Sequence, residues 1–103
     1  TVGGKVMLIP VSRVICLVAE DKYTTVVHEN GNTVIEESLL ELEARFPQQF
    51  FRIHRNALVS RAHLRGMEQE SAGRVVAVMS GTDYRPEISR RNYSAVRRFL
   101  KQL

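Results

Sequence analysis

The chain has a single cysteine and no long apolar run, and each shortage excludes a class of protein. The lone Cys16 allows no internal disulfide, which fits a cytoplasmic protein better than a secreted one. Because Cys16 lies within an apolar stretch, we expect a buried structural thiol. That stretch, residues 14–19, is the longest in the chain and has the length of a strand, not of a membrane-spanning helix. The sequence therefore predicts a cytoplasmic domain with no membrane segment.

The signatures of common enzymes are also missing. The glycine pair at residues 3–4 has neither the spacing nor the following helix of a phosphate-binding loop. Ser60 or Ser89 could pair with His54 as nucleophile and base, but no nucleophile elbow surrounds either serine. We therefore expect a protein that is not an enzyme, with no catalytic residues and no cofactor.

The histidines do not predict a metal site. His28, His54 and His63 are dispersed along the chain, and their spacings are not those of zinc ligands. His54 stands at the end of a predicted strand, where we expect its ring to form hydrogen bonds that fix the following turn. The sequence thus predicts no bound metal.

Length and composition indicate one globular domain. The chain has 103 residues, of which 44% are hydrophobic and 25% charged, which suffices for one modest core. It begins at Thr1 rather than at Met, so we expect a fragment of a longer protein. We interpret residues 1–4 as the remnant of a linker and residues 5–103 as the domain.

Positive charge is concentrated in the second half of the chain. Residues 1–50 contain four basic and seven acidic side chains, whereas residues 51–103 contain eleven basic and four acidic ones. Ten of those eleven are arginines, whose guanidinium binds phosphate oxygens and guanine edges bidentately. This asymmetry favours a surface that faces a polyanion. A solvated basic face without a partner would give the same counts.

Alternating and β-branched segments predict a mainly β fold. The expected strands are residues 5–9, 14–19, 23–28, 33–36, 50–54, 57–59, 74–79 and 84–88. An Asn-Gly pair at residues 30–31 marks a hairpin, and Pro86 confines the last strand to a sheet edge. The fold class is therefore a mostly antiparallel β structure.

Two short helices complete the prediction. The first begins at Ser38, where Ser38–Glu41 fits a capping box, and ends before Pro47. The second is expected to begin after Ser89, which can cap it. Its apolar stripe consists of Val96, Phe99, Leu100 and Leu103. We expect the apolar stripes of both helices to pack on the core.

The segment Phe50–Ser60 carries the most specific functional signal. Phe51 and Ile53 alternate with polar residues, and a second apolar run begins at Ala57, so the chain must turn at Arg55 and Asn56. Arginine and asparagine form bidentate hydrogen bonds with guanine and adenine edges in a major groove. A turn that carries both residues, on a basic chain, indicates DNA binding.

Two further polar clusters agree with this interpretation. Lys22 and Thr24 flank Tyr23 in a turn that leads into a strand, and both can donate hydrogen bonds to phosphates. Arg90 and Arg91 stand at the predicted start of the last helix, where free N–H groups favour an anion. Cations at that position are better explained if phosphates or a base edge approach them.

Together these segments resemble the LytTR-type DNA-binding domain of bacterial response regulators, most closely the alginate-biosynthesis regulator branch. The resemblance lies in Glu20–Tyr23, Ser38–Glu43, Phe51–Val59 and Ser89–Arg91, and extends over residues 5–103. It implies an elongated stack of small antiparallel β-sheets with short helices. In such domains loops, rather than a recognition helix, read the major groove.

The residues and the resemblance together assign roles, and the resemblance implies the partners. Base reading is expected from Arg55, Arg91, Asn56 and Tyr23. Phosphate contacts are expected from Lys22, Thr24, Arg52, Arg61, Arg90 and Arg97. The implied partner is double-stranded promoter DNA, bound as pairs on tandem half-sites. An N-terminal phosphoacceptor receiver domain of a two-component system is expected upstream of this fragment.

Two other functions stay open at this point. An RNA-binding β-module would place aromatic rings on an open sheet, but the alternation assigns the Phe residues to the core. A protein-interaction module with a basic face would bind DNA with neither steep salt dependence nor sequence preference. The favoured prediction is sequence-specific binding of duplex DNA, as the output domain of a transcriptional regulator.

Overall fold

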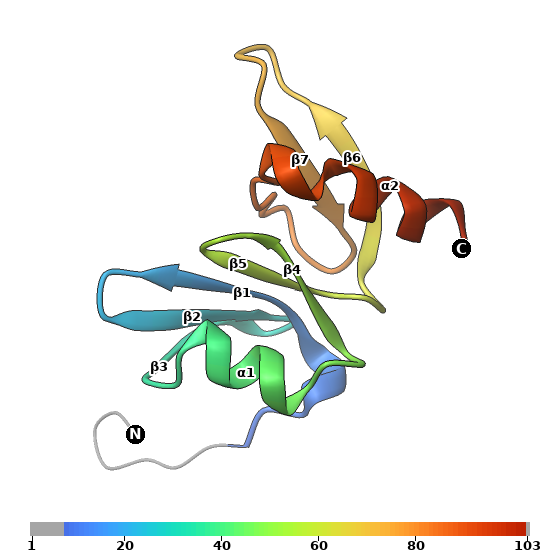
Figure 1. Cartoon of the computed structure of the whole chain (residues 1–103). Coiled ribbons are helices and arrows are strands. Elements are labelled where there is room, and N and C mark those ends of the chain that lie inside the picture. The colour runs from blue at the N-terminus through green and yellow to red at the C-terminus, as the bar shows by residue number, and fades with distance from the viewer. Residues whose placement is uncertain (1–7, 103) are drawn as a thin grey trace.

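The computed structural model describes residues 8–102, which form one five-stranded sheet, one two-stranded ribbon and two α-helices (Figure 1). The sheet contains β1 (Val14–Glu20), β2 (Tyr23–His28), β3 (Gly31–Ile35), β4 (Phe50–His54) and β5 (Ala57–Ser60), in the order β3-β2-β1-β5-β4. The ribbon pairs β6 (Leu64–Gln69) with β7 (Val75–Met79). The helices are α1 (Leu39–Arg45) and α2 (Tyr93–Lys101), and the 3-10 turns are η1 (Val11–Arg13) and η2 (Arg90–Asn92).

The elements form layers on the two faces of the five-stranded sheet. Helix α1 covers one face, and the β6–β7 ribbon with α2 lies against the other (Figure 1). All strand pairs are antiparallel, and the molecule measures 42 × 27 × 24 Å. The expected elongated, mainly β fold with two short helices is therefore confirmed.

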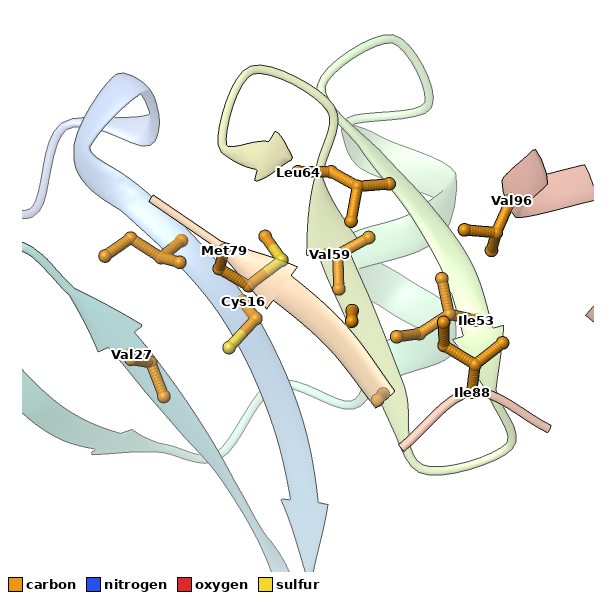
Figure 2. Packing of buried hydrophobic residues seen from close by; sticks show 11 residues of the cluster. Cys16, Val27, Ile53, Val59, Leu64, Met79, Ile88 and Val96 are labelled. Atoms are coloured by element: carbon orange, nitrogen blue, oxygen red, sulfur yellow. The ribbon is translucent and has the colours of Figure 1, made fainter. Parts of the chain in front are cut away.

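The larger core joins the sheet to the ribbon and α2. Ile53 from β4 and Val96 from α2 are fully buried there, and Ile88, which lies between β7 and η2, is 1% exposed (Figure 2). A smaller core on the opposite face joins Leu39 and Leu42 of α1 to the sheet. The sheet is thus held from both sides by burial of apolar surface.

A bulge explains the continuous apolar run in β1. The pairing register with β2 shifts between Val14 and Cys16, so Ile15 and Cys16 both belong to the larger core. Burial raises the pKa of the Cys16 thiol to about 12. The thiol therefore stays protonated at neutral pH, and the prediction of a buried structural cysteine is confirmed.

The predicted capping box at the start of α1 is confirmed. Ser38 Oγ accepts a hydrogen bond from the Glu41 backbone N at 3.1 Å, and Glu41 Oε1 accepts one from the Ser38 backbone N at 3.1 Å. The hydrogen bond from the Ser38 backbone N, and next the Ser38 hydroxyl, lower the pKa of the Glu41 carboxyl group. The helix ends at Arg45, before Pro47, and no helix among the described residues is long and apolar enough to cross a membrane.

Two predicted strands are not seen as predicted within residues 8–102. Residues 5–7 lie outside the described part of the chain, and Leu8 and Ile9 are not in a strand. The predicted strand at 84–88 is reduced to a single antiparallel bridge between Glu87 and Val76. Pro86 has no N–H to donate, so a regular ladder cannot extend through this position.

Strand β6 was not predicted from the sequence. Apolar and polar side chains do not alternate along it: Gly66 and the half-buried Met67 stand side by side between the charged Arg65 and Glu68. The strand forms because β7 pairs with it and α2 packs against it, contacts that a local pattern does not encode.

Candidate nucleic-acid interface

The turn between β4 and β5 presents Arg55 and Asn56, both of which are exposed. Its backbone groups are held in place on several sides. His54 Nδ1 accepts a hydrogen bond from the Asn56 N at 3.1 Å, and the Ala19 N donates to the Asn56 O at 2.9 Å. Arg52 Nη1 donates to the Arg55 O at 2.7 Å. The prediction that His54 fixes this turn is confirmed.

The turn between β1 and β2 consists of Asp21 and Lys22. Asp21 has a φ of 53°, in the left-handed region that aspartate tolerates better than most residues. Lys22 is exposed, and Tyr23, the first residue of β2, is 52% exposed. Thr24 is only 3% exposed, and its hydroxyl donates to the Glu37 O at 2.7 Å. The expected phosphate donor Thr24 is therefore directed into the protein.

The segment before α2 is anchored to β4. The Ser89 N donates a hydrogen bond to the Ile53 O at 2.8 Å, and Ser89 Oγ donates to the same oxygen at 3.3 Å. Asn92 Nδ2 donates to Ser89 Oγ at 2.6 Å. Arg90 and Arg91 lie between these two anchors, and both are exposed.

The predicted capping role of Ser89 is wrong in its details. The 3-10 turn η2 intervenes, so α2 begins at Tyr93 rather than directly after Ser89. The Ser89 side chain makes no capping hydrogen bond, because its hydroxyl is engaged with Ile53 and Asn92. Arg90 and Arg91 are thus presented by a turn that is fixed to the sheet.

These three segments lie at the same end of the five-stranded sheet. The hydrogen bond from Ala19 to Asn56 joins the end of β1 to the β4–β5 turn. A hollow of about 290 Å³ is lined by residues of both turns, including Lys22, Tyr23 and Arg55. The two hydrogen bonds from Ser89 to the Ile53 O place the start of η2 beside the strand that leads into the β4–β5 turn. In Figure 1 the β1–β2 and β4–β5 turns point to the left, and α2 begins above them. The structure therefore brings the three predicted loops together.

A fourth segment borders the same end and was missed as part of the site. Tyr84 and Arg85 line a hollow of about 330 Å³ together with His54 and Asn56. Burial is the main cause that raises the pKa of Tyr84, so its hydroxyl stays protonated and can donate a hydrogen bond. Arg85 forms an ion pair with Glu68 at 3.0 Å. Because residues 84–88 were predicted as a strand, this loop was not predicted as part of the site.

The arginines at this end of the sheet differ in their ion pairs. Arg52 pairs with Glu43 at 2.9 Å, whereas no ion pair within residues 8–102 involves Arg55, Arg90 or Arg91. These three guanidinium groups can therefore meet an anionic partner without breaking an ion pair inside the described protein. Such an end of the molecule suits the phosphates and base edges of a nucleic acid.

Comparison with known proteins identifies the family. The family model of the LytTr DNA-binding domain matches residues 4–101. The chain belongs to this family. A solved LytTr DNA-binding domain of a response regulator from Bacillus cereus superposes with a TM-score of 0.80 and 27% identity, over 97% of this chain and 92% of that one. This chain is thus a DNA-binding LytTR domain of the kind found in bacterial transcription regulators.

Two curated relatives of this LytTR domain are longer proteins. It is 38% identical over 97 residues to the positive alginate biosynthesis regulatory protein of Pseudomonas aeruginosa, covering 93% of this chain and 39% of that protein. It is 29% identical over 99 residues to a CO-responsive transcriptional regulator of Rhodospirillum rubrum, covering 95% of this chain and 42% of that protein. The chain spans about two fifths of the length of these relatives.

Two of the expected phosphate-binding arginines of the LytTR domain lie away from the three turns. Arg61 follows β5, at the end of the β4–β5 hairpin opposite Arg55, and its guanidinium lies 4.6 Å from the centre of the Phe51 ring. Arg97 lies on α2 and lines a hollow with Met67 of the ribbon. The structure does not bring these two side chains together with the turns.

Polar clusters elsewhere in the LytTR domain serve the fold. Ser60 Oγ forms a hydrogen bond with His63 Nδ1 at 3.0 Å, and His63 Nε2 lies 3.4 Å from Glu29 Oε2. Ser60 is 5% exposed, so this chain of bonds fastens the β2–β3 turn to the β5–β6 connection and offers no accessible nucleophile. Among residues 8–102, no group of three His, Cys, Asp or Glu side chains is arranged to hold a metal.

Proposed function

We propose that this LytTR domain binds double-stranded promoter DNA sequence-specifically by inserting its clustered turns into the major groove. One observation carries the proposal. Arg55 and Asn56 stand exposed on a turn whose backbone is fixed by His54, Ala19 and Arg52. A fixed turn can hold bidentate donors in the geometry that a base edge requires, at little entropic cost.

The proposed base-reading residues are Arg55, Asn56, Arg91 and Tyr23. All four are exposed at the same end of the sheet. Arg55 and Arg91 have the guanidinium fork that matches the two acceptors of guanine, and Asn56 has the amide that matches adenine. Tyr23 adds a ring and a hydroxyl at the edge of the same surface.

The proposed phosphate contacts are revised by burial and pairing. Lys22 and Arg90 are retained, because both are exposed beside the base-reading residues. Thr24 is not retained, because its hydroxyl is buried against Glu37. Arg61 and Arg97 would contact phosphates outside the base pairs that the turns read. Arg52 is not retained either, because its guanidinium is engaged by the Arg55 carbonyl and the Glu43 carboxylate.

The longer protein is also a matter of proposal. We propose that residues 1–4 end a linker and that residues 5–103 are the output domain of a cytoplasmic two-component regulator. A receiver domain upstream would be phosphorylated, and phosphorylation would promote pairing of two protomers on tandem half-sites. The greater length of the curated relatives supports an additional domain.

An RNA-binding β-module is less well supported. Phe50 is 3% exposed, and the Phe51 ring packs against the Phe99 ring with centroids 5.4 Å apart. Neither ring lies open on a sheet face to stack single-stranded bases, which is how such modules bind RNA. A protein-interaction module with an incidental basic face is distinguished by the experiment below.

The test selects binding sites from a random duplex library and then measures affinity for the selected operator at several salt concentrations. We expect a linear fall of log affinity with log salt, with a slope of about 0.9 per phosphate neutralised. Single-stranded RNA should compete poorly. A flat salt titration, or a library without enrichment, would refute the proposal and favour the protein-interaction module.

Variants separate base reading from phosphate binding. Arg55→Ala and Arg91→Ala should each relax the preference at particular operator positions, because a bidentate contact contributes about 1–3 kcal/mol of discrimination. Lys22→Ala should weaken all duplexes about equally and lower the salt slope by about one unit. If both arginine variants weaken every duplex by one common factor, both side chains bind phosphate and the base-reading assignment is wrong.

A further inference from the structure

Arg52 connects helix α1, through its guanidinium group, to the β4–β5 turn that carries Arg55 (the Arg55 turn). Its Nη1 donates to the backbone O of Arg55 at 2.7 Å, and its Nη2 donates to Glu43 Oε1 at 2.9 Å. The side chains of Arg52 and Glu43 are 25% and 37% exposed, so this pair is more shielded than the other arginine–carboxylate pairs of the described chain.

The position of Arg52 in β4 explains this contact. Arg52 pairs with Leu58 of β5, and Leu58 belongs to the core under α1. Directly opposed residues of two strands share a face of the sheet, so Arg52 also faces α1. From there its planar fork reaches the Glu43 carboxylate with one nitrogen and the Arg55 carbonyl with the other. A lysine ammonium is a single point and lacks this fork.

The Arg55 turn needs such a brace. The pairing register of β4 with β5 shifts between Arg52 and His54, so the ladder is irregular where it enters the turn. Productive recognition geometry tolerates errors of only about 0.5 Å and 10–20°. A side chain that holds the Arg55 carbonyl from the α1 side therefore limits how far the Arg55 guanidinium can move.

We propose that Arg52 and Glu43 are positioning residues that set the base discrimination of Arg55, and that Arg52 is not a phosphate contact. The inference rests on the proposed function, because it concerns the operator position that Arg55 reads. It assigns a specificity role to α1, which lies on the opposite face of the sheet from α2.

The decisive variant is Arg52→Lys, which keeps the positive charge and removes the fork. The assay measures affinity for the selected operator and for duplexes changed one base pair at a time, with Arg55→Ala defining the position that Arg55 reads. Wild-type discrimination there is expected at about 5- to 150-fold, the range of a bidentate contact. In Arg52→Lys it should fall to within about twofold, while discrimination at the Arg91 position and the salt slope stay unchanged.

The phosphate role predicts the opposite result. If Arg52 binds a phosphate, Arg52→Lys should keep the discrimination at the Arg55 position, and Arg52→Gln should lower the salt slope by about one unit. That pair of results would overturn the positioning inference. The melting temperature of each variant is measured beside it, so that a loss through unfolding is recognised.

Glu43→Gln provides a second variant with a matched control. Glu70→Gln removes a carboxylate of nearly equal exposure, 39% against 37%, from an ion pair of 3.2 Å with Arg74 at the β6–β7 turn. Both variants raise the net charge by one. Glu43→Gln should weaken discrimination at the Arg55 position, and Glu70→Gln should not. Equal effects would overturn the inference.

The outcomes separate this inference from the proposed function. If wild-type protein discriminates at no position, or Arg55→Ala changes none, the proposed function fails and the positioning role fails with it. If Arg55→Ala abolishes discrimination at one position but Arg52→Lys and Glu43→Gln retain it, only the positioning inference is refuted.

Discussion

Truncation of Ile53 should distinguish the residues that hold this domain together from those that face DNA. Ile53 is fully buried in the core between the sheet and α2, with Ile88 and Val96 in the same cluster. Ile53→Ala removes three carbon atoms, which costs about 2.4 kcal/mol of transfer free energy at about 0.8 per carbon. The cavity left behind adds to this, so we expect a total loss of about 3–4 kcal/mol in the free energy of unfolding.

This loss is large relative to the stability of a small domain, which is typically about 5–15 kcal/mol. The variant should therefore fold at room temperature but melt roughly 12–30 °C below the wild type. Thermal unfolding followed by far-ultraviolet circular dichroism measures the difference.

Two variants serve as controls for the Ile53 measurement. Leu40→Ala removes the same number of carbon atoms from an apolar side chain that is 72% exposed on α1, so its stability should change by no more than about 0.5 kcal/mol. Arg55→Ala should be equally mild, because the Arg55 side chain is exposed. If Ile53→Ala melts with the wild type, the core assignment is wrong. If Arg55→Ala melts as early as Ile53→Ala, Arg55 is structural and the base-reading argument fails.

Three further predictions concern local features. Burial raises the pKa of Cys16 to about 12, which is about 4 pH units above pH 8. A thiol reagent at pH 8 should therefore label Cys16 only after denaturant is added, and rapid labelling of the native protein would contradict its burial. The hydrogen bonds from Ser38 lower the pKa of Glu41, so ionised Glu41 stabilises the fold above its unfolded pKa of about 4.3, and this contribution is lost as the pH falls through the lower folded value. In urea unfolding, Glu41→Gln should thus be less stable than the wild type at neutral pH and equally stable in strong acid, and a difference that persists in acid would refute this. Ser89→Ala removes the hydrogen bonds of the Ser89 hydroxyl with Ile53 and Asn92, so it should lower the free energy of unfolding by about 1–2 kcal/mol. If the variant has the urea midpoint of the wild type, these bonds do not stabilise the domain.

The elements that follow local rules were predictable from the sequence. Strands β2 and β4 have the predicted bounds, because alternation and turn residues delimit both of them. The capping box of α1 was also predictable, since Ser38 and Glu41 satisfy each other's backbone within four residues. In each case the determining contacts lie close together in the chain.

Elements that depend on distant partners were not predictable in the same way. Strand β6 has no clear period, and its order comes from β7 and α2. The segment 84–88 has a strand-like composition, but Pro86 and its single bridge to Val76 leave it irregular. Tertiary pairing therefore orders β6 without a local pattern, whereas Pro86 prevents a regular strand at 84–88 despite the composition of that segment.

The candidate site also has features that the local sequence predicts and one that depends on a distant contact. The exposure of Arg55 and Asn56 follows from their place between two apolar runs. The burial of Thr24 could have been found by alternation, because an outward Tyr23 requires the next side chain to point the other way. The ion pair of Arg52 with Glu43 could not have been predicted, since Glu43 becomes a neighbour of Arg52 only when α1 folds onto the sheet.

Ile53 explains how the two proposed base-reading arginines keep their spacing. Its side chain is fixed in the core, while its carbonyl oxygen accepts both hydrogen bonds from Ser89, just before Arg90 and Arg91. Two residues later in the chain, Arg55 stands on the turn. The distance between the Arg55 turn and η2 is therefore set by a buried strand residue and not by the loops themselves. Because core packing resists small displacements, the loop side chains can change while the frame that spaces them stays constant.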